Sequence, residues 1–204
     1  MSARWIALEG GEGSGKSTQA ALLASARRAV LTREPGGTPV GARIRELVLG
    51  VVEGSVDPRA EALLMAADRA QHVRGVVDPA LQAGRDVVSD RSVWSSLAYQ
   101  GYGRGLDVAW LRSLSDWAMG GRWPDLAVLV DVPAAAAAER VARAGRVLDR
   151  MESEGGGFHE RVRAGFAALA AAAPDQWVVV DGDAAPEVVA GRVAEAVAAR
   201  LDPA

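Results

Sequence analysis

Residues 5–18 read WIALEGGEGSGKST, and this stretch decides the fold class. Its four apolar residues, 5–8, stop at a glycine-rich segment, and a helical pattern begins near Lys16 with Leu22 and Leu23 on one face. Residues 10–17 match the pattern G-x-x-x-x-G-K-[ST], in which backbone N–H groups surround phosphate oxygens at the start of a helix. A strand, this loop and a helix in that order predict a nucleoside triphosphate site in an α/β domain.

The P-loop pattern gives its members chemical roles. Lys16 is expected to reach the β- and γ-phosphates, and the Ser17 hydroxyl is expected to bind Mg²⁺. Lys16 is the only lysine among 23 Lys and Arg residues, so a compact ammonium is kept where every other basic side chain is a guanidinium. The expected ATP-binding residues are Gly10, Gly11, Glu12, Gly13, Ser14, Gly15, Lys16, Ser17 and Thr18.

Outside the P-loop, apolar runs alternate with helical patterns. The further runs are residues 29–32, 86–90, 126–131 and 176–181, and the helical patterns cover 40–49, 59–83 with an interruption at Pro79, a stretch from Ser92, 107–119, 134–144 and 186–201. Strands of continuous apolar residues between helices indicate a parallel sheet that is covered on both faces. We expect one P-loop domain over residues 1–204, with a three-layer α/β/α fold, a five-stranded parallel sheet and a mobile flap at about 143–157.

The composition argues against several other classes of protein. The chain has no cysteine and two histidines, so a zinc site, a thiolate nucleophile and a Ser-His-Asp triad are poor candidates. A net charge of −3 offers no basic excess for a nucleic-acid polymer, and no apolar run reaches the ~18 residues of a membrane helix. Asparagine is absent, which removes the Asn-Lys-x-Asp base reader of a guanine-specific switch. We expect a cytoplasmic protein without membrane or nucleic-acid polymer partners.

Charged residues follow the predicted strands, at the edge where ligands bind in parallel sheets. Transfer of a phosphoryl group to a small molecule requires a second anion site and cations around the transferred group. Arg33, Arg45, Arg69 and Arg91 lie at strand ends or on neighbouring helices, and Asp90 stands beside Arg91. The pattern favours a small-molecule kinase.

Several short motifs occur in one order along the chain: TREPGGT at 32–38, AADRAQH at 66–72, SSLAYQG at 95–101, GRGL at 103–106 and LDRME at 148–152. With the P-loop, these motifs make the chain resemble the thymidylate kinases of bacteria over nearly its whole length. The resemblance implies transfer of the γ-phosphoryl group of ATP to dTMP, with Mg²⁺ as cofactor. It also implies a homodimer.

The resemblance assigns roles to residues of the acceptor side. Glu12 matches the acidic residue near the 3′ side of the dTMP sugar, Arg91 matches a binder of the dTMP phosphate, and Asp90 matches an acidic residue near metal and phosphates. Tyr99 matches the tyrosine beneath the deoxyribose. The residues expected at the substrate are Glu12, Arg33, Arg45, Met65, Arg69, Arg91, Ser96, Tyr99 and Gln100, of which Arg69 is expected at the thymine edge and Met65 against the base face.

The P-loop contains no arginine, which resembles the branch of the family whose catalytic cations come from the flap. The resemblance therefore implies that Arg143, Arg146 and Arg150 join Lys16 and Arg91 as catalytic residues, with Arg150 the first choice. Met65 and Ser92 depart from the family pattern and bear on the choice of acceptor. Two alternatives stay open: a kinase for another deoxynucleotide or nucleoside, and a P-loop ATPase or regulatory binding protein.

Overall fold

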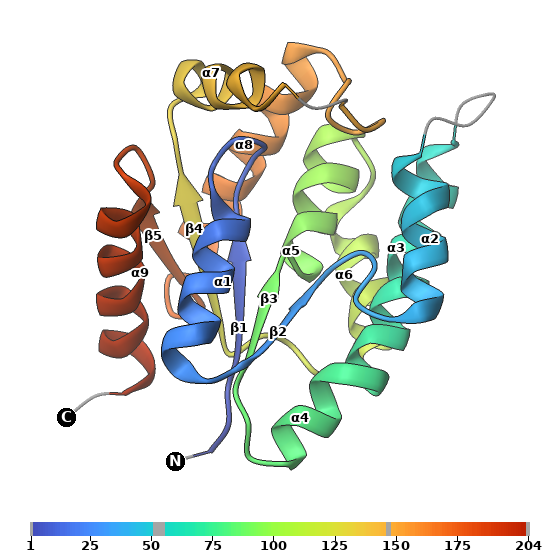
Figure 1. Cartoon of the computed structure of the whole chain (residues 1–204). Helices are drawn as coiled ribbons and strands as arrows, with labels where there is room; N and C mark the ends of the chain where they lie inside the picture. Colours follow the sequence, from blue (N-terminus) through green and yellow to red (C-terminus); the bar gives the residue numbers. More distant parts are fainter. Residues whose placement is uncertain (1, 51–55, 146–147, 203–204) are drawn as a thin grey trace.

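The computed structural model describes residues 2–50, 56–145 and 148–202. Five strands alternate with helices along the chain (Figure 1). Side chains of Thr38, Asp57 and Asp107 accept hydrogen bonds from the first N–H groups of three helices and fix where these helices begin. In chain order the elements are β1 Trp5–Glu9, α1 Lys16–Arg27, β2 Val30–Arg33, α2 Pro39–Leu49, α3 Pro58–His72, η1 Val73–Val77, α4 Asp78–Gln82, β3 Val87–Asp90, α5 Val93–Ser96, η2 Leu97–Gly103, α6 Val108–Met119, β4 Leu126–Asp131, α7 Ala134–Ala144, α8 Gly156–Ala172, β5 Trp177–Asp181 and α9 Pro186–Leu201.

The sheet is parallel throughout and has the order β2-β3-β1-β4-β5. Leu8 pairs with Asp90, and Arg33 pairs with Asp90 from the other side, so the ends of β1, β2 and β3 lie at one edge of the sheet. The predicted fold class, a five-stranded parallel sheet between helices, is confirmed.

Alternate residues of the strands face two different helix layers. Helices α1 and α9 lie together on one face of the sheet (Figure 1). Ile6 and Leu8 of β1 pack with these helices, whereas Trp5 packs with the helices of the other face. Burial on both faces explains why the strands are apolar without alternation. The second layer contains the larger core, built from α3 through α6 and α8.

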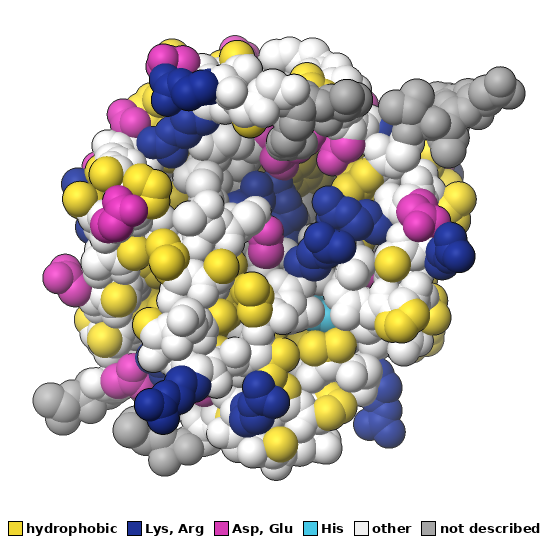
Figure 2. Space-filling model, in the orientation of Figure 1, with side chains coloured by type: hydrophobic (Ala, Val, Ile, Leu, Met, Phe, Trp, Pro, Cys, Tyr) yellow, Lys and Arg dark blue, Asp and Glu magenta, His cyan; other side chains and the backbone are white. Residues whose placement is uncertain are grey.

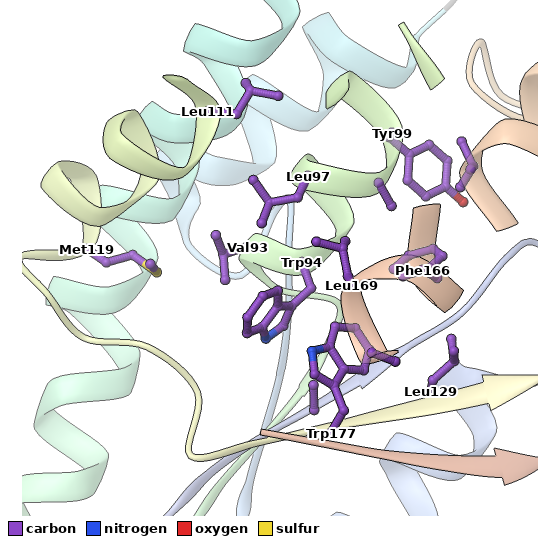
Figure 3. Close-up of a cluster of buried hydrophobic side chains, with 14 of the residues drawn as sticks. Val93, Trp94, Leu97, Tyr99, Leu111, Met119, Leu129, Phe166, Leu169 and Trp177 are labelled. Carbon is purple, nitrogen blue, oxygen red and sulfur yellow. The ribbon is translucent and has the colours of Figure 1, made fainter. Parts of the chain in front are cut away.

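Aromatic side chains fill this larger core. Trp94 of α5 lies against Trp177 of β5, with ring centroids 5.1 Å apart (Figure 3). Tyr99 of η2 meets Phe166 of α8 edge to face at 6.2 Å. Because Tyr99 also reaches the cavity described below, this packing connects the core to the site.

The expected interruption at Pro79 is wrong, and the helical path continues from α3 through η1 to α4. η1 is a π-helical segment that ends directly before α4, and Pro79 lies in the first turn of α4, where a missing N–H costs little. A second π-helical segment, η2, contains Tyr99 and Gln100. Within the part of the chain that the structure describes, no helix combines the length and apolarity needed to cross a membrane.

Candidate active site

The P-loop connects β1 to α1 and directs the N-terminus of α1 at the loop interior. Gly13 and Gly15 have φ values of 74° and 85°, a region that favours glycine. A Cβ on Gly13 would also collide with the backbone of Ala137 in α7. The loop therefore requires glycine for both its conformation and its contact with α7, and it forms an anion site at a helix start.

Lys16 is buried, and its ammonium group lies 3.2 Å from the carbonyl oxygen of Gly11 and 3.7 Å from the carboxylate of Glu12. Burial and the charge of Arg91 lower the pKa of Lys16. Burial would raise the pKa of Glu12, but the charges of Lys16 and Arg91 outweigh it and hold this pKa well below its usual range. A triphosphate beside Lys16 would supply the negative charge that favours its ammonium form.

A cavity of about 410 Å³ opens beside the P-loop. On the face shown in Figure 2, Lys and Arg side chains gather at a hollow between α1 and α2. Ten sequence-predicted residues line this cavity, namely Glu12, Lys16, Ser17, Arg33, Arg45, Met65, Asp90, Arg91, Tyr99 and Gln100. The fold thus brings together residues that come from six segments of the chain.

Arg91 lies at the centre of the site. Its guanidinium donates to the carbonyl oxygen of Gly10 at 3.0 Å, to Ser95 Oγ at 3.1 Å and to Tyr99 Oη at 2.9 Å. It also forms an ion pair with Glu12. These contacts hold the guanidinium of Arg91 at the cavity beside the P-loop, where it can bind phosphate.

Arg33 and Arg45 also line the cavity and add positive charge to it. Arg45 donates to the carbonyl oxygen of Pro35 at 3.0 Å, and burial together with the charge of Arg33 lowers its pKa. Among the described residues, Arg33 has no ion-pair partner. A guanidinium at the cavity without an ion-pair partner is available to an anionic ligand.

Two residues expected at the base, Arg69 and Ser96, lie behind the cavity wall. Arg69 is 1% exposed, pairs with Glu34 at 2.9 Å and donates to Ser96 Oγ at 2.8 Å. Glu34 also contacts His72 Nδ1 at 2.8 Å and lines the cavity. Glu34 is not among the sequence-predicted residues, although a carboxylate within the motif 32–38 is a signal that could have marked it.

The environment of Asp90 suits a divalent cation. Its Oδ1 is buried and accepts no hydrogen bond from the residues that the structure describes. Ser17 lies on the same cavity wall. The described ranges contain no group of three or more His, Cys, Asp or Glu side chains that could hold a metal ion, so Mg²⁺ would take its other ligands from nucleotide phosphates and water. Asp90 and Ser17 fit Mg²⁺ in this mode.

The two flap arginines that the structure describes, Arg143 and Arg150, contact residues outside the P-loop. Arg150 donates to the carbonyl oxygen of Val48 at 2.8 Å and to Glu61 at 2.5 Å. Arg143 is exposed and pairs with Glu139, and Arg146 lies outside the described residues. Two flap carboxylates that the sequence did not mark, Asp149 and Glu152, line the cavity.

Glu9 is fully buried beneath the P-loop. Its two carboxylate oxygens accept from Ser92 Oγ at 2.7 Å and from Ser95 Oγ at 2.6 Å. Burial raises the pKa of Glu9 to about 7, against the lowering effect of these bonds and of Arg91. Since Ser95 Oγ accepts from Arg91 and donates to Glu9, Glu9 is linked to the Arg91 guanidinium through one hydroxyl.

This fold, with a P-loop beside a cavity that Lys16, Arg33, Arg45 and Arg91 help to line, defines a nucleotide-binding phosphotransferase of the P-loop class. The family model for thymidylate kinase matches residues 8–193. A thymidylate kinase of Clavibacter sepedonicus is 52% identical over 95% of this chain and 93% of its own length, and one of Pelotomaculum thermopropionicum is 48% identical over 93% and 90%. The crystal structure of thymidylate kinase from Ehrlichia chaffeensis is 29% identical, has a TM-score of 0.78, and is matched over 96% of this chain and 98% of its own. The chain belongs to the thymidylate kinase family.

Proposed function

We propose that the chain phosphorylates dTMP to dTDP by direct in-line transfer of the γ-phosphoryl group of ATP. The overall reaction follows from membership of the thymidylate kinase family, at about half identity over most of the chain. The cavity beside the P-loop carries the proposal of direct transfer, because donor and acceptor phosphates can meet at Arg91. An acceptor phosphate is already anionic at neutral pH, so positioning and charge neutralisation supply the rate without a general base.

On the donor side, the P-loop amides and Lys16 hold the β- and γ-phosphates of ATP. Ser17 and Asp90 would hold Mg²⁺, which when bound neutralises charge on these phosphates. The unpartnered Oδ1 of Asp90 supports this placement. A divalent cation there would also reduce the repulsion between the Asp90 carboxylate and the phosphates of ATP and dTMP.

On the acceptor side, Arg91, Arg33 and Arg45 hold the phosphate of dTMP. Tyr99 lies beneath the sugar, where a 2′-hydroxyl would be crowded, and Glu12 approaches the 3′ side. The base is placed among Met65, Gln100, Ser96 and Arg69; the first two line the cavity, and the other two support it from behind. A flexible thioether at Met65 can cover the face of the base.

The flap supplies further cations in the transition state. Arg150 lies on Glu61 in this structure, so its catalytic role requires that it exchange this contact for the transferred phosphoryl group. Arg143 is exposed and paired only with Glu139 among the described residues, so little holds it in place. Arg146 belongs to the same proposal by its place in the flap.

We also propose that the chain acts as a homodimer in the cytoplasm. Helices α2, α3 and α6 pack side by side and expose large apolar side chains, of which Trp117 is 82% exposed. Such a surface favours association with a second copy. The exposed side chains are Val40, Leu47, Leu63, Trp110 and Trp117.

The proposed cytoplasmic location fits the composition, because a chain without cysteine suits a reducing compartment.

Light scattering tests the dimer. Trp117→Glu places a charge in the proposed interface and is expected to shift the mass toward that of one chain. Val188→Glu on α9 is the matched control, since Val188 is 51% exposed outside the three helices. A monomeric parent protein contradicts the dimer, and an unchanged dimeric mass for Trp117→Glu contradicts this interface.

The reaction is tested by ADP release from ATP and Mg²⁺ with dTMP, dUMP, dCMP, dGMP or no acceptor. We expect strong dependence on dTMP, with dTDP as product. ADP release without an acceptor would identify an ATPase, and preference for another monophosphate would show that the base pocket is misassigned while the phosphate site is not.

A further inference from the structure

A buried hydrogen bond joins Glu61 to Gln100, and Gln100 lines the cavity. We propose that Glu61 is a specificity-determining positioning residue: it fixes Gln100 so that a carbonyl oxygen is presented to the base, which selects thymine or uracil over cytosine. This inference rests on the proposed placement of the base beside Gln100.

Glu61 lies on α3, is 0% exposed and receives hydrogen bonds at both oxygens. Gln100 Nε2 donates to Oε1 at 2.8 Å. Arg104 Nη2 and Arg150 Nη2 donate to Oε2 at 3.2 Å and 2.5 Å. All three of these partners donate, so both oxygens of Glu61 act as hydrogen-bond acceptors.

An acceptor-only partner determines the orientation of an amide. A side-chain amide has a donor end and an acceptor end, and rotation by 180° would bring the carbonyl oxygen of Gln100 against a carboxylate oxygen of Glu61. The bond to Glu61 therefore directs Gln100 Oε1 to the other side. That oxygen is buried and has no hydrogen-bond partner among the residues the structure describes. Gln100 is 1% exposed and lines the cavity.

A buried acceptor without a partner favours a ligand that brings an N–H group. Thymine and uracil carry a hydrogen on ring nitrogen N3, whereas cytosine has a lone pair there. The carbonyl oxygen of Gln100 therefore complements the N3–H group of thymine or uracil and opposes the N3 lone pair of cytosine.

The experiment measures kcat/KM for dTMP, dUMP and dCMP in the full-length protein and in Glu61→Gln. A neutral amide at residue 61 can meet either end of Gln100, so the ratio of dTMP to dCMP should fall, roughly tenfold to a hundredfold. The parent protein should accept dUMP and dTMP well ahead of dCMP. Arg104→Met is the matched control: it removes another partner of Glu61 but leaves the bond to Gln100, and its ratio should equal that of the parent protein.

A double-mutant cycle separates positioning from a general structural role. In a Gln100→Leu background the Glu61 substitution should not change the ratio further, because the amide through which it acts is gone. If folded Glu61→Gln keeps the parental ratio of kcat/KM for dTMP to that for dCMP, even with both values lowered, the inference is overturned. If Glu61→Gln does not fold, Gln100→Leu decides alone: its ratio must fall, and a parental ratio refutes the proposal.

The two proposals fail differently. If the parent protein releases no ADP in response to dTMP, the proposed function is wrong. If it uses dTMP but the variants keep its selectivity against dCMP, the function stands and the role of Glu61 does not.

Discussion

The buried carboxyl of Glu9 predicts a specific dependence of stability on pH. Its pKa is raised by burial from 4.5 to about 7 in the folded protein. The folded state therefore binds more protons than the unfolded state between these values, and stability falls as the pH rises. The stabilisation is fully present below pH 4.5 and is lost as the pH rises through about 7. The difference between the two pKa values corresponds to about 3 kcal/mol in the free energy of unfolding, of which about 2.5 kcal/mol is lost between pH 5 and 8.

The perturbation is Glu9→Gln, which keeps the shape but has no proton to lose. Urea unfolding at several pH values between 5 and 8 gives the free energy of unfolding of both proteins. From pH 5 to 8 the free energy of unfolding of the variant should rise by about 2.5 kcal/mol relative to that of the parent. Burial also raises the pKa values of Asp68 and Asp149, but their effects are common to both proteins and cancel in the difference. The difference between the two free energies of unfolding therefore reports the titration of Glu9 alone.

Glu46→Gln is a suitable control, since Glu46 is an exposed carboxylate on α2 and this change removes one surface charge. A difference between Glu9→Gln and the parent that is the same at every pH would refute the reasoning. It would mean that the two serine hydroxyls and Arg91 keep Glu9 ionised in the folded protein throughout this range.

Three further substitutions test other parts of the molecule. Lys16→Ala should lower turnover by orders of magnitude while the circular dichroism spectrum and unfolding midpoint stay close to those of the parent; an unchanged rate contradicts the P-loop role. Arg150→Ala should reduce kcat much more than it raises the KM for dTMP, and a change in KM alone would make Arg150 a binding residue. Phe166→Ala removes a ring that is 1% exposed and supports Tyr99, so urea unfolding should show a loss of about 3–5 kcal/mol, and a loss below about 1 kcal/mol contradicts this packing.

Features that depend on neighbouring residues could be predicted from the sequence. The run of residues 126–131 and the P-loop of residues 10–17 are local patterns, so their structure follows from spacing within one turn or one strand. The apolar strands also determined the parallel sheet, because only burial on both faces accommodates them. Pro79 was misinterpreted, since a π-helical segment has no local signal of comparable strength.

The sequence by itself determined the fold class, the glycine-rich loop between β1 and α1, and ten residues that line one cavity. Only the tertiary structure decided which partners these residues have. Arg150 meets Glu61 across 89 positions of sequence, and Glu9 meets Ser95 across 86. Such pairs arise when strands and helices pack, and no local spacing encodes them. The pKa of Glu9 and the orientation of Gln100 follow from burial and from these distant partners, so they exist only in the folded chain.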